Sequence, residues 1–363
     1  MQVLSKINKQ SSFFASLISV IMGLLVGGVM MILAGYNPIQ AYIALFQSAF
    51  LQPFDIGETI RSITPLILTG LAVGLAFRTG LFNIGVEGQF IIGQLAAVIV
   101  AIKLDLPPVL HAIVAVIAGA LGGALWAFLP GYLKAKRGVH EVITTIMMNF
   151  IALYLSNLAV TEWLTEGADK TKNVPESASL HWSFLSQMFD GSSVHFGIFI
   201  AIVAAIFMYY LLWKTTTGYQ LRAVGFNPHA SEYAGMNVSR NIVLSMMISG
   251  IFAGLAGASE LLGTSGYQSI QASYTGIGFD GIAVSLLGGN TPFGIVLSAS
   301  LFGILTYGGS NMEFVAGVPR EVIRVVFAAI IFFVAANIVR WASQRRKKKK
   351  VKESNEKAVK SGD

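Results

Sequence analysis

The chain has 363 residues, of which 54% are hydrophobic and only 12% are charged, whereas a soluble domain carries roughly 25% charged residues and could not hide so much apolar surface from water. Its net charge of +7 is concentrated at the C-terminus, where Arg345 to Lys350 is an unbroken basic run, which is typical of a tail on anionic lipid and not of a spread nucleic-acid-binding patch. With no cysteine and five scattered histidines, the sequence excludes a disulfide framework and offers no metal-ligand spacing.

Ten apolar runs follow one another along the chain, and a membrane-spanning helix needs about 20 such residues. The runs cover residues 12–34, 61–78, 88–102, 109–129, 141–160, 196–213, 241–262, 277–289, 292–308 and 321–340. The first run is too long for the apolar core of a cleaved signal peptide, which has about 7–15 residues. We therefore predict an all-α membrane protein, a polytopic helical bundle of about ten transmembrane helices, some of them short or broken. The transmembrane domain is residues 12–340, between a cytoplasmic N-terminus, residues 1–11, and a basic cytoplasmic tail, residues 341–363.

Ten spans place both termini on the same side of the membrane, and the basic residues indicate which side. With the termini in the cytoplasm, all but six of the 25 lysines and arginines lie in inside segments, as the positive-inside rule requires. The six on the outside are Arg61, Lys103, Lys170, Lys172, Arg320 and Arg324. The polar stretch 161–195 is then external, and the stretches 131–140 and 214–240 are internal.

Four of the apolar runs carry the spacing Gly-x-x-x-Gly, which puts two small residues on one helical face and lets helix backbones approach closely. The pairs are Gly23/Gly27, Gly70/Gly74, Gly119/Gly123 and Gly250/Gly254. We interpret them as helix-packing surfaces with no further role.

The first break in the apolar pattern is the segment 78–89, which holds Asn83, Glu87, Gln89 and three glycines. Polar groups and irregular backbone at membrane depth are tolerated where they are buried in protein or line a water-filled cavity. One interpretation is therefore a broken helix that lines a pathway. The other is a tight turn, in which Arg78 is a topology charge and Glu87 caps the next helix, and the residues alone favour neither.

The second break is the segment 278–292, whose apolar run is too short to span a membrane alone. Asp280 stands at its start, where a carboxylate favours a helix N-terminus, and Gly288, Gly289 and Pro292 end it. We predict a short or half helix inserted into the protein. Asp280 either caps this helix or contacts a solute, and the capping role is favoured.

Polar side chains also occur within the apolar runs, namely Glu141, Asn149, Asn157 and Glu260. Glu141 begins its helix, so capping explains it. Asn149 and Asn157 are eight positions apart and so lie close to one helical face. They either bond a neighbouring helix or touch a polar solute.

The internal stretch 214–240 carries the signals of a short capped helix. Asn227 is a good N-cap, Pro228 suits the first helical position and Gly235 suits the C-terminal stop. Together they predict about two helical turns on the cytoplasmic side. Such a helix is either an ordinary surface element or a docking element for a cytoplasmic partner.

Three of these segments together resemble one protein family. They are Leu81–Gln89, then Gly218–Ala230 with Tyr233–Gly235, and then Gly278–Val284 with Leu287–Pro292. In this order, and over nearly its whole length, the chain resembles ABC permeases of the ribose, branched-chain amino-acid and nucleoside type. The segments Thr64–Leu71 and Gly138–Asn149 make it most similar to the general nucleoside permeases of Gram-positive bacteria.

The resemblance implies a permease subunit of an ATP-driven importer in the bacterial cell membrane, which moves its solute by alternating access and is not an enzyme. The implied partners are a separate ATPase subunit, a second, related permease chain, membrane lipids and an extracellular substrate-binding lipoprotein that docks near 161–195 and 309–320. No catalytic residue, cofactor, metal or nucleic acid is implied. The implied ATPase-coupling residues are Arg222, Gly225, Asn227, Pro228, Ala230 and Gly235. From the two breaks and the polar positions, the candidates for the translocation path are Asn83, Glu87, Gln89, Asn149 and Asp280.

The sequence contains no Gly-x-x-x-x-Gly-Lys-[Ser/Thr] motif, the loop that cradles phosphates in many ATPases, so ATP hydrolysis is assigned to another polypeptide. Two alternatives stay open. One keeps the importer and changes its cargo to a simple sugar. The other is an ion-coupled secondary transporter that uses buried acids such as Glu87 or Glu260 as proton or sodium sites.

Overall fold

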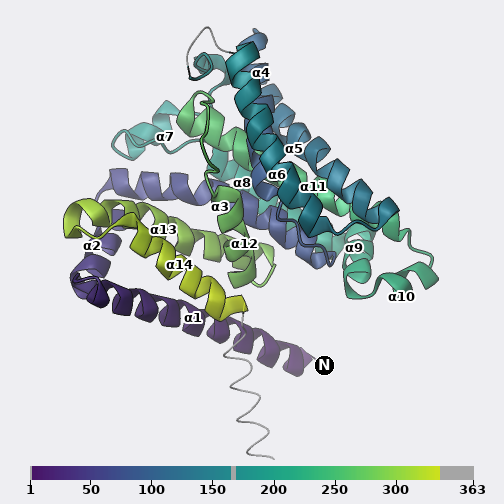
Figure 1. Ribbon diagram of the computed structural model, residues 1–363, viewed down its shortest axis with the longest axis horizontal. Helices are drawn as coiled ribbons and strands as arrows, with labels where there is room; N and C mark the ends of the chain where they lie inside the picture. Colours follow the sequence, from purple (N-terminus) through teal and green to yellow (C-terminus); the bar gives the residue numbers. More distant parts are fainter. Residues whose placement is uncertain (1, 165–168, 336–363) are drawn as a thin grey trace, which may run out of the picture. The chain divides into compact units, whose positions relative to one another are not determined.

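The computed structural model describes residues 2–164 and 169–335 (Figure 1), and the chain divides into two compact units. The first consists of residues 1–43 with 312–363, and the second of residues 44–311. Apart from two isolated bridges, the described part of the chain contains helices and no strand. The predicted basic tail, which begins at residue 341, lies outside the described residues.

The first unit is built on two helices, α1 (Gln2–Leu33) and α14 (Arg320–Ala335). Gly23 of α1 faces Ile330 of α14, and Gly27 faces Val326, so closely that a Cβ on either glycine would collide with the opposite side chain. The two helices therefore pack antiparallel through the predicted Gly-x-x-x-Gly face.

The second unit contains the remaining long helices. These are α3 (Pro53–Arg78), α4 (Val86–Lys103), α5 (Leu110–Arg137), α6 (Glu141–Ala159), α8 (Gly197–Lys214) and α11 (Val238–Glu260). The shorter elements are η1 (Val160–Leu164), η2 (Glu176–Ala178), α7 (Ser183–Met188), α9 (Thr216–Phe226), α10 (Pro228–Tyr233), η3 (Leu261–Ser265) and α12 (Ile277–Leu287). Two helices, α2 (Pro38–Phe50) and α13 (Pro292–Ala316), cross the division between the units.

Seven helices of the described residues are long and apolar enough to cross a membrane, when the π-helical turns η1 and η3 are counted with α6 and α11. They cover residues 53–78, 86–103, 110–137, 141–164, 197–214, 238–265 and 292–310. Residues 17–33 and α12 are apolar but shorter, and the predicted run 321–340 ends outside the described residues. The all-α polytopic class is confirmed, whereas the number of about ten spans stays a prediction.

Helix α11 is central to the second unit and packs against α3, α4 and α5. Gly250 of α11 lies so close to Gly123 of α5 that a Cβ there would meet the Gly123 carbonyl oxygen. Gly70 of α3 similarly receives the side chain of Val284 from α12. The Gly-x-x-x-Gly pairs of α3, α5 and α11 are thus packing surfaces, as predicted.

The outer faces of α5 and α8 are covered by large apolar side chains. Leu125, Val203 and Ile206 are among those that are mostly exposed. In water, large continuous apolar surfaces are rare on a monomeric protein, whereas a lipid bilayer accommodates them. These faces are suited to lipid.

Some helix limits differ from the prediction. Helix α3 begins at Pro53 and not at 61, because Asp55, Glu58 and Arg61 in its first turns find partners within the protein. Two helices were not predicted from the sequence: α2, which is too short to span a membrane, and α9, which lies in a polar stretch.

Candidate functional site

The N-terminus of α12 is held by a carboxylate from another helix. Glu87, in the first turn of α4, is fully buried. Its Oε1 accepts hydrogen bonds from the Thr275 hydroxyl (2.9 Å) and the Gly276 N–H (2.9 Å), and its Oε2 accepts one from the Gly278 N–H (2.6 Å). A helix leaves such N–H groups unsatisfied at its N-terminus and favours a negative charge there. Glu87 therefore caps α12 from a distant part of the sequence.

The connection between α3 and α4 is fixed by a pair of side-chain amides. Asn83 Nδ2 donates to Gln89 Oε1 (3.0 Å) and Ser249 Oγ (2.9 Å). Asn83 Oδ1 accepts from Gln89 Nε2 (3.2 Å) and from the Gly85 N–H (3.0 Å). Both amides are buried, so these bonds replace the ones that water would otherwise make.

Helix α6 contributes two asparagines whose side chains bind backbone groups of other segments. Asn149 Oδ1 accepts from the Gly88 N–H (2.8 Å), and its Nδ2 donates to the Ile84 carbonyl (3.1 Å). Asn157 donates to the Gln271 carbonyl (2.8 Å) and accepts from the Gln271 N–H (2.9 Å). Of the two uses that the sequence leaves open, these contacts are bonds to neighbouring segments.

Residues 266–276 run without helix from η3 to the N-terminus of α12. Ala272, Ser273 and Thr275 within this segment are exposed. Asp280 is half-buried in the first turn of α12, but the N–H groups at the start of the helix bind Glu87. The predicted path residues Asn83, Glu87, Gln89, Asn149 and Asp280 therefore gather around the start of α4 and the start of α12.

The predicted coupling residues lie on α9, on α10 and in the turns beside them. Asn227 Oδ1 accepts from the Ala230 N–H (3.0 Å), and Pro228 is the first residue of α10. Gly235 follows the helix with a φ of +80°, a conformation that glycine adopts without strain. The predicted cap, start and stop of this helix are confirmed.

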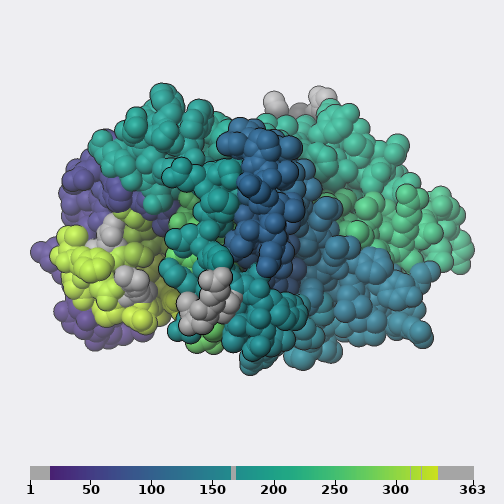
Figure 2. Space-filling view, turned by 90° about the horizontal axis from the view of Figure 1, so that it is seen from above, coloured from purple at the N-terminus to yellow at the C-terminus, as the bar shows by residue number. Residues whose placement is uncertain are grey.

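Helix α10 stands out at one end of the second unit, and Figure 2 shows the same end as a green lobe at the right of the surface. Phe226 is 87% exposed and Tyr233 is 94% exposed, and Ala230 between them is exposed as well. Exposed aromatic rings of this kind are enriched where proteins bind one another. Arg222 and Gly225 instead face inward, toward α8 and the end of α3.

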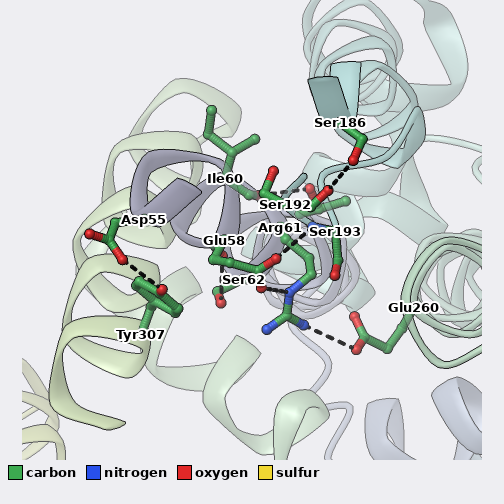
Figure 3. A network of polar contacts seen from close by, with 11 residues as sticks. Asp55, Glu58, Ile60, Arg61, Ser62, Ser186, Ser192, Ser193, Glu260 and Tyr307 are labelled. Atoms are coloured by element: carbon green, nitrogen blue, oxygen red, sulfur yellow. Dashed lines mark hydrogen bonds and ion pairs between the residues drawn. The ribbon is translucent and has the colours of Figure 1, made fainter. Parts of the chain in front are cut away.

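Three charged side chains form a network at the beginning of α3 (Figure 3). Arg61 Nε donates to Glu58 Oε2 (2.6 Å), and Arg61 Nη1 lies 3.7 Å from Glu260 Oε1 on α11. Glu58 Oε1 also accepts from the Ser193 N–H (2.6 Å). Charges with little exposure to solvent are stable only when they are paired. Glu260 is therefore a partner of Arg61 and not an isolated acid.

The segment before α8 is fastened close to this network. Burial, helped by the positive charges of Arg61 and His181, lowers the pKa of His195 to about 4. The imidazole is therefore neutral at pH 7, and its Nδ1 accepts a hydrogen bond from the Gly197 N–H (3.1 Å). In the described ranges, His, Asp and Glu side chains form no group that could hold a metal ion.

The network of Arg61 was not predicted from the sequence, in which this residue counts only as a topology charge. A local signal exists, because Glu58 and Arg61 are three positions apart and such residues are neighbours on a helix surface. Their partner Glu260 comes from a distant helix and gives no local signal. The contacts of Arg78 with the carbonyls of Gly289 and Asn290 give no local signal for the same reason, since these residues lie more than 200 positions along the chain.

Comparison with known proteins identifies related chains. The family described as "Branched-chain amino acid transport system / permease component" matches residues 56–335. The guanosine ABC transporter permease protein NupP of Bacillus subtilis is 51% identical over 94% of this chain and 99% of its own length. The nucleoside ABC transporter permease protein NupB of Lactococcus lactis is 40% identical over 92% of this chain and 93% of its own length. The glucose ABC transporter permease protein TsgB13 of Haloferax volcanii is 33% identical over 87% of this chain and 85% of its own length.

Proposed function

The chain belongs to the branched-chain amino acid transport system permease family, and we propose that it is the nucleoside-carrying permease subunit of an ATP-driven importer. As a permease component it is a transport protein and not an enzyme. The observation that carries the choice of cargo is the similarity, over nearly the whole chain, to relatives named as guanosine and nucleoside permeases.

The non-helical segment before α12 supports a translocation path at this position. At one end of the segment, the Gln271 N–H donates to Asn157. At the other end, the Gly276 N–H donates to Glu87, and the next residue in α4, Gly88, donates its N–H to Asn149. Because both asparagines lie inside the candidate span 141–164, the segment runs at membrane depth. Exposed irregular backbone at that depth is tolerated where it lines a water-filled cavity. We therefore infer that residues 271–276 line the path.

The predicted path residues then act by shaping this wall. Glu87 holds the junction of the segment with α12, and Asn83, Gln89 and Asn149 hold the start of α4 beside it. A transporter alternates between discrete states, and its packed interior switches between defined arrangements because it cannot deform continuously. Hydrogen bonds that fix the positions of these elements keep each arrangement defined. We infer that solute moves past the exposed side chains of 271–276.

We infer that the transporter also contains a second, related permease chain, a cytoplasmic ATPase pair and an extracellular substrate-binding lipoprotein, in a bacterial cell membrane with both termini in the cytoplasm. The lipoprotein docks near 161–195 and 309–320. The ATPase docks on α10, a capped helix that offers a rigid contact, with exposed aromatic rings at its last residue, Tyr233, and just before it, at Phe226. ATP-driven closure of the ATPase pair pushes α10, and the membrane helices shift to open the path to each side in turn.

The alternative of an ion-coupled secondary transporter has less support. Such a transporter needs a carboxylate that takes up and releases an ion. Both oxygens of Glu87 accept hydrogen bonds from the start of α12 or from Thr275 just before it, and Glu260 lies beside Arg61. The alternative of a sugar cargo is favoured by one observation, the similarity to a glucose permease.

Uptake of radiolabelled guanosine tests the proposed cargo, in cells that lack other nucleoside uptake and express the chain with its partner subunits. We expect ATP-dependent uptake that excess unlabelled adenosine reduces and excess glucose leaves unchanged. Competition by glucose in place of nucleosides would overturn the nucleoside assignment. Uptake that survives ATP depletion but collapses with an ionophore would overturn the ATP-driven mechanism.

Single-cysteine labelling is expected to place residue 170 outside the cell and residues 136, 229 and 348 inside. The expectation follows from the distribution of basic residues and the positive-inside rule. The chain has no native cysteine, so Lys170→Cys, Lys136→Cys, His229→Cys and Lys348→Cys each report a single site. A membrane-impermeant maleimide applied to intact cells is expected to label only the first. Labelling of position 229 from outside would contradict the predicted membrane topology.

A further inference from the structure

The turn between α12 and α13 contains two consecutive residues in the left-handed backbone region. Gly289 has a φ of +62° and Asn290 a φ of +54°, and residues other than glycine adopt this region at a cost. Arg78, the last residue of α3, donates from Nη2 to the Gly289 carbonyl (3.1 Å) and from Nε to the Asn290 carbonyl (2.8 Å). Its positive charge also suits the C-terminal end of α12. Arg78 thus ties this turn to α3.

The other contacts of Arg78 lead toward α10. The guanidinium carbon of Arg78 lies 5.5 Å from the centroid of the Trp213 ring at the end of α8, and that of Arg222 on α9 lies 5.9 Å from the same ring. Both distances are in the range of cation–π attraction. The buried Nε of Arg222 has no hydrogen-bond partner, so the ring face is an important contact for this guanidinium. Trp213 therefore joins Arg78 to α9.

Helix α9 also touches the end of α3 through bare backbone. A Cβ at Gly225 would collide with the carbonyl oxygen of Arg78 and meet the backbone of Thr79. Gly80, with a φ of +75°, faces Gly225 from the other side of this contact. Because packed backbones transmit a displacement without absorbing it, a movement of α9 presses on the residue that holds the α12–α13 turn.

We propose that Arg78 is a positioning residue that transmits the movement of α9 and α10 to the half helix α12. This proposal rests on the proposed function, in which an ATPase moves α10. The N-terminus of α12 is fastened to α4 by Glu87, beside the path-lining segment 271–276. A shift of the α12–α13 turn therefore moves α12 about its capped end and changes the wall of the path.

Replacing Arg78 in the assembled transporter tests the transmission. In Arg78→Gln we expect the ATPase to co-purify and to hydrolyse ATP, while uptake per amount of transporter falls about tenfold or more. Arg78→Lys is expected to show a similar loss, because an ammonium group lacks the planar fork that reaches two carbonyls. Arg137→Gln is the matched control, since Arg137 is an exposed arginine at the C-terminal end of α5, and its uptake is expected to be unchanged.

Trp213→Leu tests whether the aromatic ring takes part in the transmission. This variant keeps the hydrogen bonds of Arg78 to the turn and removes the ring between Arg78 and Arg222. A role for the ring predicts the same combination of retained ATP hydrolysis and lost uptake as in Arg78→Gln. Normal uptake in Trp213→Leu would overturn the role of the ring and leave the backbone contact of Gly225 with Arg78 as the route.

Spin-label distances measure the movement itself. One label pair joins exposed Phe293 in α13 to a reference at Tyr132 in α5, and a second pair joins exposed His229 in α10 to the same reference. We expect ATP to change both distances in the parent chain and only the second in Arg78→Gln. An unchanged response of the first pair in Arg78→Gln would overturn the transmission role. Failure of the ATPase to co-purify with the parent chain would instead overturn the proposed function.

Discussion

Ala230→Trp is expected to insert normally into the membrane, to lose co-purification of the ATPase subunit and, as a result, to lose uptake. Ala230 is exposed on α10, between the exposed rings of Phe226 and Tyr233, so a larger side chain has room in the chain itself and obstructs a partner. Extra volume forced into a packed interface costs about 1–3 kcal/mol, which weakens binding roughly five- to 150-fold. Affinity capture of the permease, followed by quantification of the ATPase, measures the effect.

Two further variants make this result specific. Ala34→Trp is the matched control, because Ala34 is exposed, follows α1 and belongs to the first unit, whereas the coupling residues belong to the second; we expect normal ATPase binding. Gly235→Val is expected to resemble Ala230→Trp, because the φ of +80° at this position strains a β-branched residue and disturbs the stop of α10. A stable Ala230→Trp chain with normal ATPase binding and uptake would refute the docking role of α10.

Helix α10 could be predicted from the sequence because each of its signals acts within one or two turns. Asn227 supplies the cap, Pro228 the start and Gly235 the stop, and none of them depends on a distant residue. The all-α class follows from equally local information, since long apolar runs in a membrane must satisfy their own backbone hydrogen bonds and do so as helices. The docking partner of α10 lies outside the chain, and its role remains a proposal.

The cap of α12 could not be predicted, because its bonds connect distant parts of the chain. Glu87 and Thr275 are separated by 188 positions, and no local pattern marks such a pair. Asp280 is the acid nearest to the start of the half helix, so the sequence favours it as the cap, whereas the first N–H groups bind Glu87. The existence of a half helix was predictable from its glycines and its length, but its anchoring was not.

The beginning of α3 shows a related limit of sequence reasoning. Asp55, Glu58 and Arg61 look like residues of a connecting loop, because isolated charges are costly in an apolar environment. Within the fold, Arg61 lies between two carboxylates and Asp55 accepts from the Tyr307 hydroxyl (2.9 Å). The paired charges let the helix begin earlier than the apolar run does.

Glu87→Ala is expected to abolish uptake and to lower the amount of the chain in the membrane by a smaller factor. The change leaves the Gly276 and Gly278 N–H groups without their acceptor, and each unsatisfied buried donor costs about 1–3 kcal/mol. This cost falls on the start of α12 and on segment 271–276, whereas the close contact of α11 with α5 is untouched. The wall of the path therefore loosens before the unit unfolds. Uptake divided by the amount of chain in the membrane is the measurement that separates the two effects.

The effect of the Glu87 carboxylate on uptake can be separated from the effect of the side-chain volume. Glu87→Gln keeps the volume but replaces one acceptor oxygen with an NH₂ donor, which then opposes another donor at the start of α12, so we expect a loss of uptake close to that in Glu87→Ala. Gln94→Leu is the control, because Gln94 is buried in the same helix and its Oε1 has no partner; its uptake is expected to be normal. Normal uptake in Glu87→Gln would show that the charge does not hold α12. Equal losses of abundance and uptake in both Glu87 variants would mean that the residue serves folding alone and does not shape the wall of the path.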